Sequence, residues 1–305
     1  MSGTLRLSIV IPAYNAEDTL GDQLDAIAPQ VVGTGVEVIV ADNGSTDGTG
    51  AVVTGRARTA RYLRLIDASA RRGPSAARNI GASHAVGRAL VFCDADDVVG
   101  DGWLRAMSDA LDRHDVVGGS LDFTRLNRRS GGMGAPAAFP LSYLPGMRGA
   151  GSGNLAVARE AFLSVGGFDE DLRVGEDVDL CCRLQLAGHV LHPCDEAVVH
   201  VRLRGGVVSA FRHAHSFGAA DRQLRHRYAQ VSAAIEAGTW IPPMQDAPSR
   251  SEAGADQRAS GAHRWKRVLR PRRIDPTAFA RRLGRRIGER AGRIDRSLPQ
   301  VAPPP

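Results

Sequence analysis

Short apolar runs alternate with amphipathic stretches along roughly the first two hundred residues. Runs such as LSIVIPA and ALVFC indicate buried strands, and the stretches between them carry apolar residues at helical spacing. This alternation predicts an α/β protein whose mostly parallel sheet is connected by crossover helices. Strands are expected at 6–14, 36–42, 61–68, 89–93, 115–126 and 196–204, helices at 16–31, 49–57, 74–87, 102–114 and 175–189, and a strand leading into a helix at 154–168.

The pattern changes in three places, which suggests how the chain is divided. Residues 130–152 are rich in Gly and Pro without periodicity, as is typical of a flexible loop over a site. Residues 236–262 have few large apolar groups and are interpreted as a linker. The predicted domains are 1–235 (nucleotide-binding half 1–100, acceptor half 101–235), the flexible linker 236–262, and a basic tail 263–305 that is partly an amphipathic helix.

Charge separates this tail from the remainder. Residues 264–296 hold 13 Lys or Arg and three acids, so the formal net charge of +6 divides into +10 there and −4 elsewhere. Phe279, Leu283 and Ile287 share one helical face among arginines, which suits an anionic membrane surface, reached through 263–296, or an acidic partner. A solvated or disordered basic tail is the alternative. Nucleic acid is not an expected partner, because the charge of the predicted catalytic region is negative.

Length and composition narrow the class of protein further. With 305 residues and 43% hydrophobic content, the chain can bury a large core. Four cysteines without zinc-type spacing or disulfide density favour reduced, cytosolic thiols. The apolar run at the N-terminus is too short for a signal peptide, and no run approaches the roughly 20 residues of a spanning helix. We expect a cytoplasmic protein, soluble or peripheral on the inner face of the plasma membrane.

Acidic residues follow two of the predicted buried strands. Asp42 ends VEVIVAD, and Asp94, Asp96 and Asp97 follow ALVFC. Carboxyl ends of parallel strands share one edge of the sheet, where ligands bind at the point where strand order reverses. Carboxylates this close repel one another unless positive charge compensates, and Mg²⁺ or Mn²⁺ supplies it while retaining phosphate oxygens as ligands. Asp-rich turns and helix caps are the common alternative.

Two other stretches could carry chemistry. Glu176 and Asp177 begin a predicted helix, where free N–H groups favour an ionised carboxylate, and simple N-capping is the alternative. In the last predicted strand, alternation places His200 on one face with Arg202 and Arg204, a set that could face a diphosphate. A satisfied structural histidine is the other interpretation of His200.

Five blocks occur in an order more specific than any one of them. They read VIPAYNAEDTL, VIVADNGSTDGT, RRGPSAARNIGASHAVGRALVFCDADD, GGFDEDL and GEDVDLCCRLQLAGH. In this order they resemble family 2 glycosyltransferases over roughly residues 6–205. The resemblance implies a GT-A fold, a Rossmann-like, mostly parallel sheet flanked by helices, and the basic C-terminal tail has no match in it.

The resemblance also implies catalytic and metal-binding roles. Asp177 matches the general base that takes the acceptor proton, a role for which burial would raise its pKa usefully. Asp94 and Asp96 match the D-x-D metal pair, with Asp97 as a supporting neighbour. Several family members use a late histidine as a further ligand, so the predicted metal ligands are Asp94, Asp96 and His200, binding Mn²⁺ or Mg²⁺.

Substrate contacts follow in the same way. The predicted substrate-binding residues are Pro12, Tyr14, Asp42, Gly73, Arg78, Asn79, Asp94 and Glu176. Among them Tyr14 belongs to the base-and-ribose loop, Asp42 contacts the base, and Glu176 orients the acceptor. The chain departs from the pattern at Asn43, where many relatives have a second Asp. Without the resemblance, Tyr14 could be an ordinary half-buried aromatic, and Arg78 could pair with an acid on a helix.

The reaction implied is inverting transfer from a nucleoside-diphosphate sugar, with UDP expected, to a glycan or lipid-linked acceptor in cell-envelope polysaccharide, glycolipid or glycoconjugate synthesis. A catalytically inactive nucleotide-sugar or carbohydrate-binding protein is one alternative, and a sugar nucleotidyltransferase is another. The Gly-rich, Arg-bearing phosphate loop of nucleotidyltransferases is missing after the first strand, as are dinucleotide and P-loop motifs.

Overall fold

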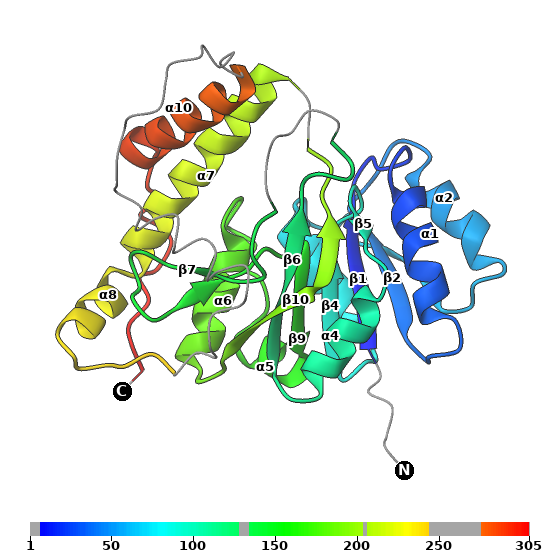
Figure 1. The fold of residues 1–305 in the computed structure, drawn as a ribbon, viewed down its shortest axis with the longest axis horizontal. Helices are drawn as coiled ribbons and strands as arrows, with labels where there is room; N and C mark the ends of the chain where they lie inside the picture. The colour runs from blue at the N-terminus through cyan, green and yellow to red at the C-terminus, as the bar shows by residue number, and fades with distance from the viewer. Residues whose placement is uncertain (1–6, 128–133, 204–205, 244–275, 305) are drawn as a thin grey trace, which may run out of the picture. The chain divides into compact units, whose positions relative to one another are not determined.

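The computed structural model describes residues 7–127, 134–203, 206–243 and 276–304 (Figure 1). Elements are named in chain order. The strands are β1 (Leu7–Ala13), β2 (Glu37–Asp42), β3 (Leu63–Asp67), β4 (Ala89–Cys93), β5 (Val98–Val99), β6 (Val116–Asp122), β7 (Phe139–Pro140), β8 (Arg148–Gly149), β9 (Asn154–Ala158) and β10 (Leu191–His200). The helices are α1 (Leu20–Val31), α2 (Thr49–Ala57), α3 (Pro74–Ser83), α4 (Trp103–Leu111), α5 (Arg159–Ser164), α6 (Glu176–Leu186), α7 (Val207–Arg227), α8 (Ala229–Glu236) and α10 (Pro276–Ala291).

One eight-stranded sheet organises the first unit, which contains residues 7–141, 146–202 and 242–243 apart from the undescribed 128–133. Its order is β3-β2-β1-β4-β9-β6-β10-β5. β1 pairs in parallel with both β2 and β4, β2 with β3 and β6 with β10, whereas β9 and β5 run antiparallel to their neighbours. Strand order therefore reverses beside β1, which places the ends of β1, β2 and β4 at the predicted crevice.

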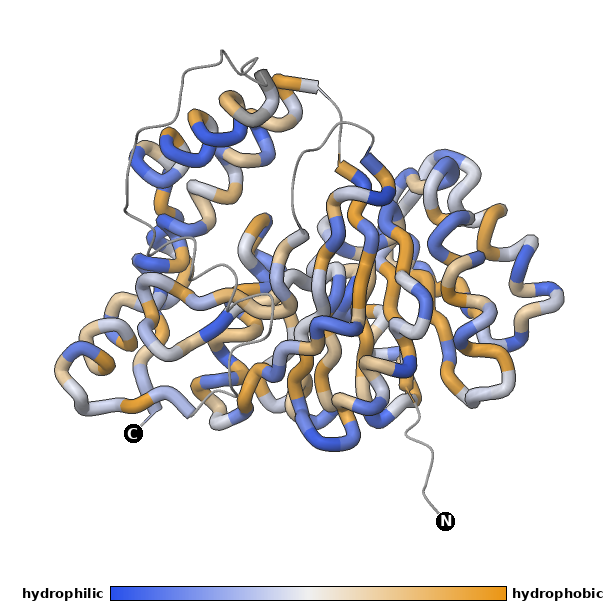
Figure 2. Tube along the Cα trace, viewed as in Figure 1, coloured by the Kyte–Doolittle hydropathy of each residue, from blue (hydrophilic) through white to orange (hydrophobic). Residues whose placement is uncertain are grey.

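The two faces of the sheet are covered by different helices. Side chains of Leu7, Ile9 and Ile11 pack with α1, α2 and α4, whereas Val10 packs in the cluster that holds α3, α5 and α6. Figure 2 shows the resulting band of hydrophobic residues along the central strands. Because every strand residue from Leu7 to Ile11 is buried, β1 lacks the polar alternation of a half-exposed strand.

A second unit contains residues 142–145, the described part of 203–241, and 276–304. Within it α10 packs along α7, and Val301 N–H donates to the Arg227 carbonyl. This grouping differs from the predicted one, in which a single domain runs to residue 235. Most of the predicted linker, from 244 onward, lies outside the described residues.

The structure also corrects some predicted elements. The described part of 130–152 is not an unstructured loop, because β7 and β8 pair there and Leu144 and Met147 are buried. β10 begins at Leu191, five residues before the predicted strand, and α7 and α8 were not predicted.

All four cysteines, Cys93, Cys181, Cys182 and Cys194, are buried. Among the described helices, none combines the length and apolarity needed to cross a bilayer.

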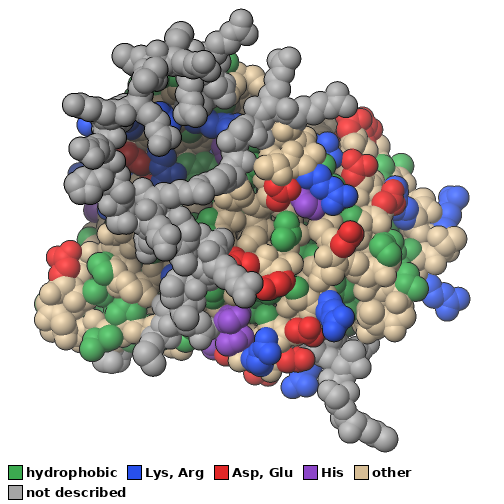
Figure 3. Space-filling model, viewed as in Figure 1, with side chains coloured by type: hydrophobic (Ala, Val, Ile, Leu, Met, Phe, Trp, Pro, Cys, Tyr) green, Lys and Arg blue, Asp and Glu red, His purple; other side chains and the backbone are tan. Residues whose placement is uncertain are grey.

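On the face of the molecule drawn in Figure 3, acidic and basic side chains of the described residues are interspersed with one another.

Candidate active site

The tips of β1 and β2 carry the predicted base-binding residues. Asp42 lies opposite Ala13 in the register, and its Oδ1 accepts hydrogen bonds from Ser45 N–H (3.0 Å) and Ser45 Oγ (2.6 Å). Tyr14, one residue beyond β1, is 52% exposed, and the Arg72 guanidinium lies 5.3 Å from its ring centroid. Sequence reasoning missed Arg72. The pair offers an aromatic face and a positive charge side by side, which are the features that stack on a base and attract phosphate.

Asn43 is buried and links the end of β2 to the loop before α3. Its Nδ2 donates to the carbonyls of Ala68 (2.6 Å) and Arg71 (2.8 Å), and its Oδ1 accepts from Gly73 N–H (2.8 Å). Gly73 has φ 128°, a conformation that favours glycine. The departure from the family pattern therefore has a structural reason, because an ionised aspartate could accept but not donate.

Replacing Asn43 with Asp should lower the free energy of unfolding by about 1–3 kcal/mol, since the buried Ala68 carbonyl and the Arg71 carbonyl both lose their donor. Burial would raise the pKa of the new carboxyl above its unfolded value, so the folded state would hold its proton to higher pH. The deficit measured by urea unfolding should consequently shrink as pH falls from 7 toward 5. An equal deficit at both values would contradict this explanation.

A buried guanidinium connects the two predicted halves of the site. Arg78, on α3, has a side chain only 4% exposed. Its Nη2 donates to Asp94 Oδ1 (2.6 Å) and its Nη1 to Glu176 Oε1 (3.2 Å). Both charges hold the pKa of Arg78 above its ordinary value, although desolvation opposes them. The structure thus brings Arg78, Asp94 and Glu176 together as one charged network.

Three carboxylates gather after β4. Oxygens of Asp94, Asp96 and Asp97 lie within 4.8 Å of one another. Burial, followed by the charge of Asp94, raises the pKa of Asp97 to about 8. The three aspartates offer only oxygen ligands, and nearby positive charge does not fully balance their negative charge. Such a ligand set fits Mg²⁺ or Mn²⁺. Asp97, which the sequence suggested only as a supporting neighbour, is a full member of this cluster.

The cluster is held by residues distant in sequence. Gln23, buried on α1, donates from Nε2 to the Asp94 carbonyl (3.0 Å) and accepts from Val99 N–H (2.9 Å). Arg202 N–H donates to Asp97 Oδ1 (2.9 Å), and its Nε to the Asp96 carbonyl (3.1 Å). A Cβ added to Gly153 would lie 2.8 Å from Asp94 Oδ2, so glycine leaves room for that carboxylate.

Glu176 and Asp177 open α6, but neither occupies the N-cap position, which is Gly175. Asp177 accepts hydrogen bonds from Val178 N–H (2.8 Å) and Ser152 N–H (3.3 Å). Burial is the main cause that raises the pKa of both carboxyls, and the charge of Asp177 adds to the shift at Glu176. Asp177 is half-buried, and a carboxylate with a raised pKa is suited to accept a proton near neutral pH.

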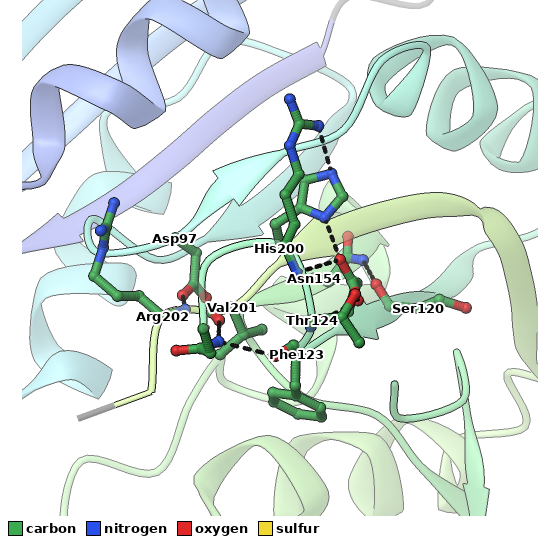
Figure 4. A network of polar contacts seen from close by, with 11 residues as sticks. Asp97, Ser120, Phe123, Thr124, Asn154, His200, Val201 and Arg202 are labelled. Carbon is green, nitrogen blue, oxygen red and sulfur yellow. Dashed lines mark hydrogen bonds and ion pairs between the residues drawn. The ribbon is translucent and has the colours of Figure 1, made fainter. Parts of the chain in front are cut away.

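His200 is not brought to the acidic cluster. Its Nδ1 lies 2.7 Å from Asp122 Oδ2 and its Nε2 3.0 Å from Arg125 Nη1, so both ring nitrogens have partners (Figure 4). Because a guanidinium only donates, Nε2 accepts and Nδ1 carries the hydrogen in this arrangement. Within the described chain, the group of residues placed to bind a cation is the three aspartates. The geometry therefore does not support His200 as a ligand.

Of the other predicted substrate-binding residues, Pro12 and Gly73 lie at the ends of the strands and helices around the site, whereas Asn79 is used in internal hydrogen bonds. Pro12 lies in β1 opposite Ala41, and Gly73 precedes α3. Asn79 uses its amide internally, since Nδ2 donates to the Phe168 carbonyl (2.9 Å) and to Glu170 (2.9 Å). Asn79 therefore fastens the GGFDEDL segment.

Comparisons with known proteins identify the family of the chain. Residues 8–150 match the model described as glycosyl transferase family 2. The succinoglycan biosynthesis protein ExoO of Rhizobium meliloti is 30% identical over 286 residues, 82% of this chain and 79% of that protein. The chain belongs to glycosyltransferase family 2. The glycosyltransferase AglE of Haloferax volcanii is 29% identical over 201 residues, 63% of this chain and 65% of that protein.

Solved structures share the fold of this family 2 transferase. The mannosyltransferase PcManGT of Pyrobaculum calidifontis, in complex with GDP-Man and Mn²⁺, aligns with a TM-score of 0.61 at 21% identity over 94% of this chain and 87% of that one. S. aureus TarS residues 1–349, in complex with UDP, aligns with a TM-score of 0.51 at 20% identity over 70% and 65% of the two chains. These structures confirm the predicted GT-A fold, and the family model together with the similarity to ExoO confirms the transferase class.

Proposed function

We propose that this family 2 enzyme transfers a sugar from a nucleoside-diphosphate donor, with UDP expected as the nucleotide, to an acceptor hydroxyl with inversion and with help from Mn²⁺ or Mg²⁺. The observation that carries the proposal is the Arg78 bridge. One buried guanidinium contacts Asp94 of the predicted cation site and Glu176 beside the predicted base. Donor and acceptor chemistry would then proceed at the two ends of one rigid network.

In the proposed reaction, Asp177 takes the proton of the acceptor hydroxyl as that oxygen attacks the anomeric carbon. The new carbon–oxygen bond forms while the bond to the diphosphate breaks on the opposite face, so no covalent enzyme intermediate arises. Asp94, Asp96 and Asp97 would hold the metal, which when bound neutralises charge on the departing diphosphate. Glu176 would orient the acceptor, and Tyr14 with Asp42 the nucleoside.

The acceptor and cellular setting are part of the same proposal. A glycan or lipid-linked acceptor in cell-envelope polysaccharide synthesis is supported by the similarity to ExoO, whose name assigns it to succinoglycan biosynthesis. A nucleotide-sugar donor would require access from the cytoplasmic side, where we place the enzyme. The neighbours bound to UDP and to GDP-Man differ in base, so the donor must be measured.

Thermal protection and hydrolysis with UDP-, GDP- and dTDP-sugars, each with and without Mn²⁺, test the donor. We expect one nucleotide class to raise the unfolding temperature of the protein, and only when metal is present. In the Asp96→Ala variant, that nucleotide should no longer raise the unfolding temperature even with metal. Protection by several classes equally, or protection unchanged by chelation, would overturn the donor and metal assignments.

The turnover rate should fall on the acid side at a pH above the ordinary carboxyl range of about 4. Burial raises the pKa of Asp177 and Glu176, and a protonated Asp177 cannot accept the acceptor proton. Measured with saturating donor and metal, the Glu176→Gln variant should shift this limb to lower pH, because a neighbouring negative charge is removed. A shift to higher pH would contradict the coupling of the pair.

A further inference from the structure

The small residues of α10 face α7. Ala280, Gly284 and Gly288 are buried along one side, as is Gly292 directly after the helix. A Cβ added to Gly284 or Gly288 would run into the carbonyl oxygens of Phe211 and His215 on α7. The backbones therefore approach as closely as glycine allows, and α10 has a fixed rotation about its axis.

Polar contacts fix the same orientation. Arg285 forms ion pairs with Asp221 on α7 and with Glu289 one turn along α10. Beyond the helix, Gln223 and the Asp295 backbone exchange two hydrogen bonds of 3.0 and 2.6 Å. The inward face of α10 is thus the side with the smallest residues.

This packing leaves the large apolar side chains outside. Phe279, Leu283 and Ile287 are 60%, 42% and 38% exposed, reversing the usual arrangement in which the apolar stripe of a helix is buried. α7 and α10 both show alternating hydrophobic and hydrophilic residues in Figure 2. The exposed row of Phe279, Leu283 and Ile287 is called the α10 apolar row below.

A row of positive charge accompanies the α10 apolar row. Arg282, Arg286 and Arg290 follow its three members at a spacing of i+3, and all three are exposed. α10 as a whole holds five arginines and one glutamate, and that glutamate pairs with Arg285. Exposed apolar and cationic rows therefore lie next to each other on the face directed away from α7.

We infer that α10 docks on a lipid bilayer containing anionic headgroups. A nucleic acid or acidic protein surface would match the arginines and leave three large apolar side chains in water, whereas a purely apolar groove would leave the arginines unmatched. An anionic bilayer matches both, because the apolar row enters the acyl boundary while the guanidinium groups reach the headgroups. The inference is independent of the transfer reaction.

Co-sedimentation of the full chain with vesicles tests it, using phosphatidylcholine with and without phosphatidylglycerol. We expect binding only to the anionic vesicles, weakened by salt. Phe279→Ser/Leu283→Ser/Ile287→Ser should bind about tenfold more weakly or worse. Arg282→Gln/Arg286→Gln/Arg290→Gln should bind more weakly and with a smaller salt dependence. The substituted side chains are exposed, and circular dichroism checks that both variants stay folded.

Matched controls come from the first unit. Val32→Ser/Val86→Ser/Leu163→Ser removes three comparably exposed apolar side chains, and Arg58→Gln/Arg61→Gln/Arg113→Gln three exposed arginines. Both should sediment like the unaltered protein. Unchanged binding by the α10 serine variant would overturn the proposal. Equal binding of the protein to both vesicle types would also overturn it. Two further results would do the same: binding of soluble polyglutamate through the arginines by a protein that does not bind vesicles, or a dimer detected by light scattering that the α10 serine variant no longer forms.

Discussion

The Asp177→Asn variant should bind the donor with unchanged affinity and lose transfer by a factor of about 10²–10⁴. The amide keeps the size of the carboxyl, and its single oxygen can still accept one of the two N–H bonds that Val178 and Ser152 donate to the separate carboxylate oxygens. It cannot take the acceptor proton at neutral pH. The loss should therefore appear in turnover, measured as release of the nucleoside diphosphate in the presence of acceptor, and not in the donor dissociation constant.

Asp179→Asn provides the matched control on the same helix. Asp179 is fully buried and pairs with Arg183 through a 2.7 Å contact, so its loss should affect stability and leave turnover of the folded fraction intact. If Asp177→Asn retained near-normal turnover, the assignment of the base would be wrong. The same result with an intact donor site would leave the metal and nucleotide assignments standing.

The sequence identified the parts of the site that strand order alone determines. Asp42 and Asp94 follow buried strands whose pattern is visible in VEVIVA and ALVFC, and the pairing of both strands with β1 brings their ends to one edge. These positions are encoded locally, since a parallel strand presents its carboxyl end to the same side as its neighbours.

Pairings across long separations were not visible in the same way. Glu176 lies 98 positions after Arg78, and neither stretch contains a pattern that names the other. For His200, the alternation of apolar and polar residues predicted the strand but not the hydrogen-bond partners of the side chain. Those partners, Asp122 and Arg125, lie at and just after the end of the neighbouring strand β6. The polar partner of a side chain depends on tertiary neighbours that periodicity does not encode.

The tail shows the same limit at the level of one helix. Helical spacing predicted α10 and its apolar row, yet which face would be buried was open. The signal was present in Gly284 and Gly288, four residues apart, which permit a close approach to α7 that Phe279 or Leu283 would prevent. Close packing through small residues was therefore the stronger determinant than hydrophobicity at this interface.

Replacing Arg78 with Met should give the largest loss of stability in the site, about 3–5 kcal/mol, together with loss of transfer. Methionine fills much of the same volume but leaves the partly exposed Asp94 and the buried Glu176 without their shared cation, and an unpaired charge is strongly unfavourable at a buried position such as that of Glu176. Urea unfolding measures the first effect. Arg64→Met is the comparison, because Arg64 pairs with Glu37 at 2.8 Å but is 41% exposed, so its loss should cost about 1 kcal/mol or less.

Adding Glu176→Gln to Arg78→Met separates the charge effect from packing. The double variant should recover part of the lost stability, since one of the two stranded carboxylates is gone, whereas a packing defect would persist. Turnover should not recover, because the link between the acidic cluster and the start of α6 remains broken. If the Arg78→Met variant were as stable as the Arg64→Met variant, the bridge would contribute little to stability. The network would then be a consequence of the fold, and it would not link the donor site to the acceptor site.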